Sequence, residues 1–173
     1  MLNINTPVTE EVVRNLHAGD MITLSGVIYT GRDAVLPKVC DYIVKNKKLP
    51  EKVSLEGSVI FHTAVSRAGG GPTSSNKYEI ESSMSVLSDT GVKIHLGKGT
   101  ISKETIMQLD KYNSVYAIIP PVTALLNSKT LSMEVVAFPE LGMEAMYKLM
   151  VSKYPVIIAA AHGESIYDKG ERL

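Results

Sequence analysis

Short β-rich runs alternate with helical apolar patterns along most of this chain, and this alternation limits the folds that it can adopt. Alternating strands and helices predict an α/β architecture in which helices cover a mixed central sheet. The loops at the carboxyl ends of the strands gather on one side of such a sheet, and ligands bind there. The strands are expected at residues 21–29, 58–64, 92–96, 115–119, 134–138 and 156–161.

Four helices are expected between these strands, each recognised by apolar residues at helical spacing. Ser102 precedes the third helix and is expected to cap it. No repeat or linker divides the chain, and 173 residues suffice for one packed core, so residues 1–173 are expected to form a single domain. The four apolar faces are formed by Val35, Val39, Tyr42 and Ile43; by Ile80, Met84 and Leu87; by Ile106 and Leu109; and by Met143, Met146 and Met150.

The charge balance and the cysteine content exclude several classes of function. Eighteen basic and eighteen acidic residues cancel, which argues against broad binding to nucleic acid or to a membrane surface. No apolar run is long enough to span a bilayer, and the N-terminus does not resemble a signal peptide. Cys40 is the single cysteine, so the chain has no internal disulfide, and the cytoplasm is the expected compartment. One thiol and four scattered histidines predict no metal site.

Residues 69–77, which read Gly-Gly-Gly-Pro-Thr-Ser-Ser-Asn-Lys, are the best candidate for a binding loop. The glycines carry no Cβ and leave backbone N–H groups able to approach a ligand closely. Hydroxyl groups follow where a helix is expected to begin, and a lysine closes the segment. Such a combination suits an oxyanion. A surface loop with an ordinary helix cap fits the same residues equally well.

Two cationic side chains follow predicted strands at the same side of the expected sheet. Lys98 lies between two glycines and can present its ammonium group to a carboxylate with little hindrance, although a solvated lysine is the alternative. Arg32 precedes an expected helix, where a cation opposes the helix dipole, and an anionic ligand would resolve this conflict. Asp33 is expected to act as a cap or dipole partner of the same helix.

Covalent catalysis by this chain alone has no support in the sequence. Cys40 lies beside an apolar helical stripe, where an inert buried thiol is the common case. His62 and His95 fall in predicted strands and are expected to be partly buried structural residues. Because no nucleophile is paired with a base, a self-sufficient hydrolase is the weakest of the alternatives.

Four motifs occur in a specific order along residues 9–167, and together they closely resemble a known family. The family comprises the β subunits, or C-terminal domains, of class I fumarate hydratases and L(+)-tartrate dehydratases. The resemblance implies a swivelling β/β/α domain whose mixed central sheet lies between layers. The motifs are SGVIYTGRD at 25–33, GPTSS at 71–75, GVKIHLGKG at 91–99 and EVVAFPELGMEA at 134–145.

The resemblance also implies an activity that needs a second subunit. Members of the family are iron-dependent hydro-lyases that add water to or remove it from a dicarboxylate, such as fumarate or tartrate. An α subunit holds a [4Fe-4S] cluster through three cysteines, so this chain, with Cys40 alone, is expected to bind no cluster by itself. A hetero-oligomer with the α subunit is therefore expected, or a homodimer when the chain is alone.

Six residues take site roles through the same resemblance. Arg32 matches the arginine that binds a substrate carboxylate, and Thr73 matches a threonine that takes part in proton abstraction. The hydroxyl of Ser74 and the backbone around Gly71 would donate further hydrogen bonds to the substrate. The expected substrate-binding residues are Arg32, Gly71, Ser74 and Lys77, and the expected catalytic residues are Thr73 and Lys98.

The chain departs from the family pattern near the expected site. Ser74 replaces a threonine, and Lys77 replaces an arginine, which keeps the charge but loses the bidentate grip on a carboxylate. Pro120 and Pro121 replace a pair of glycines, and residues 61–68 lack the usual Gly-Pro. These changes leave open which dicarboxylate is used. They also leave open a non-catalytic anion-binding or regulatory paralogue.

Overall fold

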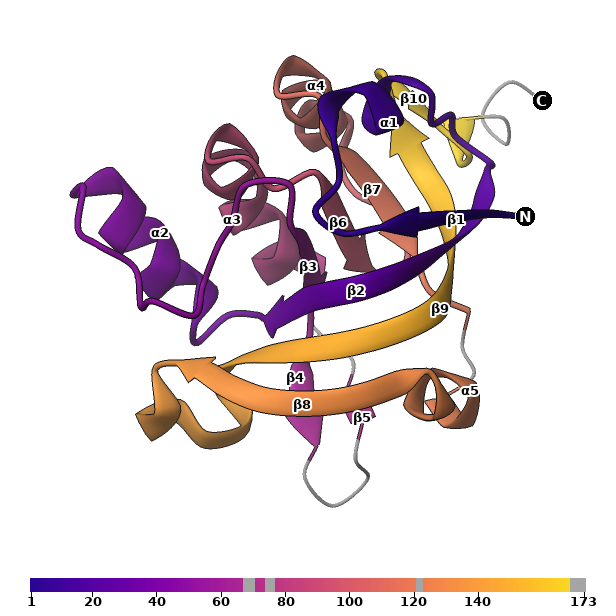
Figure 1. Ribbon diagram of the computed structural model, residues 1–173. Coiled ribbons are helices and arrows are strands. Elements are labelled where there is room, and N and C mark those ends of the chain that lie inside the picture. Colours follow the sequence, from indigo (N-terminus) through magenta and orange to yellow (C-terminus); the bar gives the residue numbers. More distant parts are fainter. Residues whose placement is uncertain (67–70, 74–76, 121–122, 169–173) are drawn as a thin grey trace.

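The computed structural model describes residues 1–66, 71–73, 77–120 and 123–168 (Figure 1). The strands are β1 (Leu2–Asn5), β2 (Met21–Gly31), β3 (Val59–His62), β4 (Ala64–Ser66), β5 (Gly71–Thr73), β6 (Ile94–Gly97), β7 (Val115–Ile118), β8 (Thr130–Ala137), β9 (Met146–Ala161) and β10 (Glu164–Ser165). The helices are α1 (Glu10–Arg14), α2 (Leu36–Val44), α3 (Lys77–Asp89), α4 (Lys103–Lys111) and α5 (Thr123–Ser128), with a 3₁₀ segment η1 (Pro139–Glu144).

The main sheet is mixed, and its pairings close on themselves. Strands β1, β2, β3, β6 and β7 are parallel neighbours, while β9 pairs antiparallel with β7, β8 and β2. The β2–β9 pairing joins the two ends of the path β2-β3-β6-β7-β9, so the sheet is barrel-like. The expected mixed α/β class is confirmed. The closed sheet is not the layered arrangement that the resemblance implied, and the swivelling β/β/α class stays a prediction.

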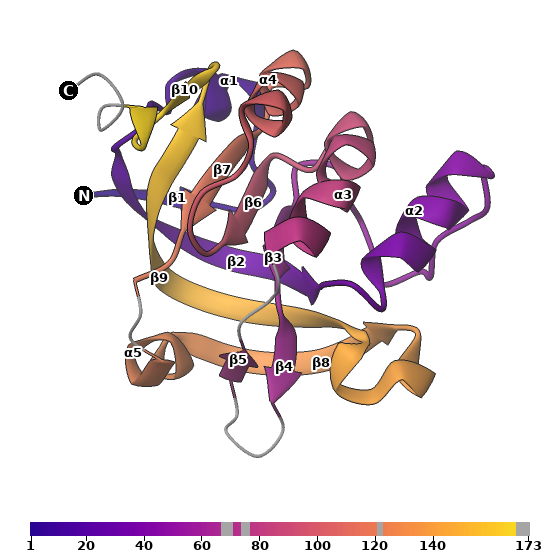
Figure 2. The ribbon, with the colours of Figure 1, turned by 180° about the vertical axis from the view of Figure 1, so that it is seen from behind.

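Apolar residues form three clusters, one inside the closed sheet and two beneath the helices. Val59 of β3 packs inside the sheet with Leu24 and Ile158, whereas its neighbour Ile60 packs with Val39 of α2. This difference follows from the alternation of side chains along a strand. Helices α2, α3 and α4 lie outside β3, β6 and β7, and the β4–β5 hairpin extends toward the β8–β9 ribbon (Figure 2). None of the helices that the structure describes is both long and apolar enough to cross a membrane.

The helix expected over Met143, Met146 and Met150 is wrong. Residues 139–144 form η1, and β9 begins at Met146. The spacing of four residues between Met146 and Met150 fits one helical turn, but it also places both side chains on the same face of a strand. The alternate residues Tyr147, Leu149 and Val151 point into the interior of the sheet. Pairing with β2 on one side and β8 on the other selects the strand.

The other predicted elements are mostly found within a few residues of their expected bounds. Helix α4 begins after Ser102, whose Oγ accepts a hydrogen bond from the Thr105 N–H, so the predicted cap is confirmed. Helix α2 begins only at Leu36, and its N-cap residue is Val35. The predicted role of Asp33 as a helix cap is therefore wrong.

Candidate functional site

The carboxyl ends of β2, β3 and β6 lie side by side and form the candidate site edge. Gly31 of β2 pairs with His62 of β3, and Phe61 pairs with Leu96 of β6. Arg32 and Lys98 directly follow β2 and β6, so both leave the sheet at this edge. Their backbones are separated by two strand spacings, or about 10 Å. The structure thus brings together two cations that lie 66 positions apart in the sequence.

Arg32 forms a bidentate ion pair with Glu144 at this edge. Its Nε donates to the two carboxylate oxygens of Glu144 at 2.8 and 3.1 Å, and its Nη2 also donates to Oε1. Asp33 adds a weaker contact, with its Oδ1 3.5 Å from Nε. Because the helix begins later than expected and Glu144 neutralises the guanidinium, an internal carboxylate resolves the charge conflict noted in the sequence.

Sequence patterns did not indicate Glu144 as a site residue, because its partner Arg32 lies 112 residues away in the sequence. The signal that could have found it is the antiparallel register. Thr30 pairs with Tyr147, and extending this register by two residues sets Arg32 beside Ala145 and Glu144. That register depends on strand β9. The sequence predicted a helix in place of the start of this strand, so the register could not be inferred.

Lys98 is exposed, but the backbone of the loop that carries it is fixed by hydrogen bonds. The buried Tyr116 of β7 donates its hydroxyl to the carbonyl oxygens of Lys98 and Gly99, at 3.0 and 3.1 Å. Gly97 permits this approach, since a Cβ there would lie 2.9 Å from the Tyr116 hydroxyl oxygen. Burial, with smaller effects from the charges of Tyr167 and Glu81, raises the pKa of Tyr116, which keeps the phenol protonated as a donor. No partner contacts the Lys98 ammonium among the residues that the structure describes.

The glycine loop returns to the same edge through a hairpin. Strand β5 pairs antiparallel with β4, and Thr73 lies opposite Ala64, two residues beyond the end of β3. Gly71 pairs with Ser66 and therefore lies farther from the edge than Thr73. Lys77 is the first residue of α3. Ser74 lies outside the described residues, so the oxyanion cradle stays a prediction.

A chain of buried hydrogen bonds lies beneath this edge. His62 Nε2 is 2.8 Å from His95 Nδ1, and His95 Nε2 is 2.8 Å from the hydroxyl of Ser88 on α3. Burial lowers the pKa of His62 to about 3 and that of His95 well below its ordinary value, with a further contribution from His62. Both imidazoles are therefore neutral near pH 7. Their predicted place in strands is confirmed, but both are fully rather than partly buried, and the sequence did not show that they contact each other.

The described residues do not fit a metal or cluster site. They contain no group of three or more histidine, cysteine, aspartate or glutamate side chains that could hold a metal ion. Cys40 of α2 is partly buried, with its Sγ 3.9 Å from the carbonyl oxygen of Ser83, and burial raises the pKa of its thiol. A protonated thiol in this setting is a poor nucleophile and a poor ligand.

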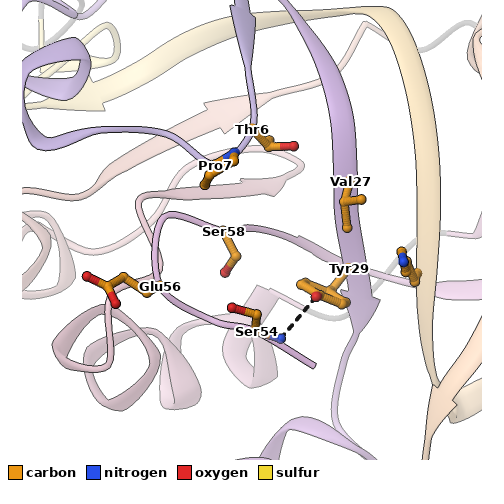
Figure 3. A pocket seen from close by; sticks show the side chains of 8 residues that line it. Thr6, Pro7, Val27, Tyr29, Ser54, Glu56 and Ser58 are labelled. Carbon is orange, nitrogen blue, oxygen red and sulfur yellow. Dashed lines mark hydrogen bonds between the residues drawn. The ribbon is translucent and has the colours of Figure 1, made fainter. Parts of the chain in front are cut away.

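A cavity of about 260 Å³ lies on another part of the sheet (Figure 3). It opens between the end of β1, the loop before β3 and the outer face of β2. Tyr29 projects into it, with its hydroxyl accepting a hydrogen bond of 3.0 Å from the Ser54 N–H. Neither Arg32 nor Lys98, the two predicted site residues whose side chains the structure describes, lines this cavity. Its lining is formed by Thr6, Pro7, Val27, Tyr29, Ser54, Glu56, Ser58 and Lys148.

Comparison with known proteins places the chain in a family. The β subunit of L(+)-tartrate dehydratase named in Methanocaldococcus jannaschii is 33% identical over 93% of this chain and 88% of its own length. The L(+)-tartrate dehydratase β subunit of Escherichia coli K12 is 29% identical over 98% of this chain and 88% of its own length. A class I fumarate hydratase named in Geobacillus stearothermophilus is 26% identical over 99% of this chain, which spans 34% of that protein. The family model described as Fumarase C-terminus matches residues 1–170. The chain therefore belongs to the fumarase C-terminus family.

Proposed function

We propose that this chain is the β subunit of a hydro-lyase that interconverts a hydroxy-dicarboxylate and its dehydrated product. Malate with fumarate and tartrate with oxaloacetate are the two proposed substrate pairs. The observation that carries the proposal is the parallel register that brings Arg32 and Lys98 to one edge, with the backbone of Thr73 returning nearby. Two cations about 10 Å apart in backbone position suit a ligand with a carboxylate at each end.

Each site residue has a distinct task in this proposal. Arg32 and Lys98 bind and orient the two carboxylates and reduce their negative charge. Thr73 takes part in moving a proton, and because a threonine hydroxyl is a weak base, a group of another subunit would have to activate it. Gly71, Ser74 and Lys77 would supply further donors to the substrate. Several charge-assisted hydrogen bonds are needed to hold a dianion against its hydration.

A second subunit is part of the proposal. Lys98 at this edge is exposed, and the G. stearothermophilus relative extends well beyond the matched region. We propose that an α subunit covers this edge and holds the [4Fe-4S] cluster, for which the described residues of this chain offer no ligand set. We also propose a cytoplasmic setting, because Cys40 is a free thiol. For the fold, we propose the swivelling β/β/α class that the family resemblance implies.

Anaerobic reconstitution tests this function. The chain and its α partner, purified separately and mixed with the cluster intact, are expected to hydrate fumarate or dehydrate tartrate, while neither chain alone does so. Fumarate is followed by its ultraviolet absorbance, and oxaloacetate by coupling to malate dehydrogenase. An assembled complex with an intact cluster that turns over no small hydroxy-dicarboxylate would contradict the proposal.

A non-catalytic anion-binding or regulatory protein is the second candidate. It is favoured by Lys77 in place of the family arginine and by the ion pair that already neutralises Arg32. It predicts that the isolated chain binds malate or tartrate in a calorimeter and that no cysteine-bearing partner copurifies with it. Turnover by the reconstituted complex would exclude it.

Tyr116→Phe is expected to lower kcat/KM of the complex by roughly three- to tenfold. The change removes both hydrogen bonds to the Lys98 loop and keeps the ring, so the ammonium is less well positioned while the core stays filled. Steady-state kinetics and thermal unfolding measure the two effects separately. Tyr154→Phe is the matched control, since Tyr154 is equally buried and its hydroxyl has no hydrogen-bond partner among the residues that the structure describes. Equal kinetics for the two variants would remove Tyr116 from the support of the site.

A further inference from the structure

The cavity drawn in Figure 3 has walls that backbone hydrogen bonds hold together. The segment after β1 is tied to β2, because the Thr6 N–H donates to the carbonyl oxygen of Ser25 at 2.9 Å. The same segment is tied to the loop before β3, because the Val8 N–H donates to the carbonyl oxygen of Gly57 at 2.7 Å. Gly57 in turn donates its N–H to the carbonyl oxygen of Gly91 at 2.8 Å. The cavity is therefore preformed, as small-molecule sites usually are.

The floor of the cavity is the outer face of the sheet. Val27 and Tyr29 lie on one face of β2, and Lys148 of β9 pairs with Tyr29. Tyr29 also pairs with Ile60 of β3, and extending this parallel register back by two residues sets Ser58 beside Val27. Ile60 packs in the cluster beneath the helices, and Ser58 and Val27, farther along the same face, line the cavity. The cavity thus continues the outer face of the sheet beyond Ile60.

Ser58 carries a buried hydroxyl group that the described part of the chain does not satisfy. The residue is 5% exposed, and its Oγ has no hydrogen-bond partner among the residues that the structure describes. Figure 3 shows Ser58 between Thr6 and Pro7 on one side and Ser54 on the other. Removing a hydroxyl group from water without a new hydrogen bond is unfavourable. A bound ligand that forms a hydrogen bond with Ser58 would remove this cost.

Opposite charges flank this hydroxyl group. Glu56 lies two residues before Ser58 and is exposed, and its carboxylate forms no ion pair with the residues that the structure describes. On the other side of β2, Lys148 and Lys52 share the carboxylate of Glu134, at 3.8 and 3.1 Å, so these three side chains carry one net positive charge. The cavity therefore has a negative charge on one side and an excess positive charge on the other.

We propose that this cavity binds a free α-amino acid in its zwitterionic form. The carboxylate of the ligand pairs with Lys148, its ammonium group pairs with Glu56, and the hydroxyl of Ser58 forms a hydrogen bond with the ligand between these charges. An apolar side chain of the ligand packs against Val27 and Pro7. Dicarboxylates do not suit the cavity, because Glu56 repels a second carboxylate.

The size of the cavity selects the probe for this site. An apolar cavity of about 150 Å³ accepts benzene, so a volume of about 260 Å³ suits a molecule of roughly ten non-hydrogen atoms, such as leucine. Neither Arg32 nor Lys98 lines the cavity. This binding site goes beyond the proposed function and does not depend on it, so the full chain can be tested without a partner.

Calorimetry with three molecules of similar shape tests the proposal. L-Leucine carries both charges, leucic acid lacks the ammonium group, and isoamylamine lacks the carboxylate. The full chain at pH 7 and low salt is expected to bind L-leucine at least about tenfold more tightly than either analogue, because each analogue loses one charge-assisted contact. Equal affinity for the three molecules, or no binding of L-leucine at millimolar concentration, would overturn the proposal.

Ser58→Ala separates binding of the ligand from stability of the fold. The variant is expected to weaken L-leucine binding by about tenfold. Thermal unfolding of the free chain is expected to stay the same or to shift to a higher temperature, since the hydroxyl group has no described partner to lose. An unchanged affinity combined with a lower melting temperature would show a purely structural hydroxyl group and would overturn the proposal.

Glu56→Gln tests the contact with the ammonium group at an exposed position. The variant is expected to bind L-leucine about tenfold more weakly and to bind leucic acid no less tightly than the unmodified chain does. Glu51→Gln is the matched control, because Glu51 is an exposed carboxylate of the same loop that does not line the cavity. It is expected to leave the affinity for L-leucine unchanged. Equal affinities of the two variants for L-leucine would contradict the proposed site.

Discussion

Replacing Lys98 by alanine is expected to lower kcat/KM of the assembled enzyme by roughly 10²-fold or more. The ammonium is exposed and contacts no partner among the described residues, so its removal takes away an interaction with the substrate and leaves the internal contacts intact. Because Glu144 already balances Arg32, the loss of Lys98 also removes a positive charge that no described residue compensates. Steady-state kinetics measures the loss, and circular dichroism shows that the fold is kept.

Two further variants test whether the loss of activity comes from the charge and position of Lys98. Lys98→Arg keeps the charge and is expected to retain part of the activity, since a guanidinium can still reach a carboxylate from the glycine-flanked loop. Lys103→Ala removes another exposed lysine, at the start of α4, and is expected to leave the kinetics unchanged. Near-normal kinetics for Lys98→Ala would remove this residue from the site.

Acidification from pH 7 to pH 5 is expected to destabilise the folded chain by several kcal/mol. Burial lowers the pKa of His62 to about 3 and that of His95 well below the ordinary 6.5, so both stay neutral when folded. In the unfolded chain each takes up a proton below about pH 6.5, so the unfolded state binds more protons and gains stability as the pH falls. For His62 the difference amounts to about 2 kcal/mol at pH 5, and His95 adds to it in the same direction. Urea unfolding at pH 7, 6 and 5 measures it.

The slope of stability against pH identifies the source of this effect. His62→Gln/His95→Gln is expected to be less stable at pH 7 but to show a flatter slope between pH 6.5 and 5. His17→Gln changes a histidine whose side chain is 72% exposed and is expected to keep the original slope. Glu10, which pairs with Lys93, has a pKa lowered from 4.5 chiefly by that hydrogen bond, so its contribution is lost only at lower pH. An unchanged slope in the double variant would refute the histidine origin.

The local pattern of the sequence predicted the elements whose signals lie within one segment. Ser102 caps α4 because a hydroxyl three residues before a free N–H suffices, whatever the rest of the chain does. Strands β2, β6 and β7 were predicted within two residues at each end, since they are bounded by turns and glycines. The resemblance to the family rests on motifs of the same local kind, and the family was confirmed.

The helix predicted across Met146 and Met150 shows where local patterns fail. A spacing of four residues fits one helical turn and one face of a strand equally well, so the spacing of the methionines does not distinguish a helix from a strand. Pairing with β2 and β8 made the choice, and it also closed the sheet into its barrel-like course. The same pairing set Glu144 beside Arg32, which no local signal could indicate.

By itself, the sequence determined the family, the alternation of strands and helices, and the candidate residues Arg32, Lys98 and Thr73. These depend on residue type and on short spacings, which can be recognised in the sequence without knowledge of the fold. Only the tertiary structure decided that Glu144 neutralises Arg32, that Tyr116 holds the Lys98 loop and that His62 contacts His95. Each of these contacts joins different strands or segments, and strand register, a property of the whole sheet, determines which residues meet.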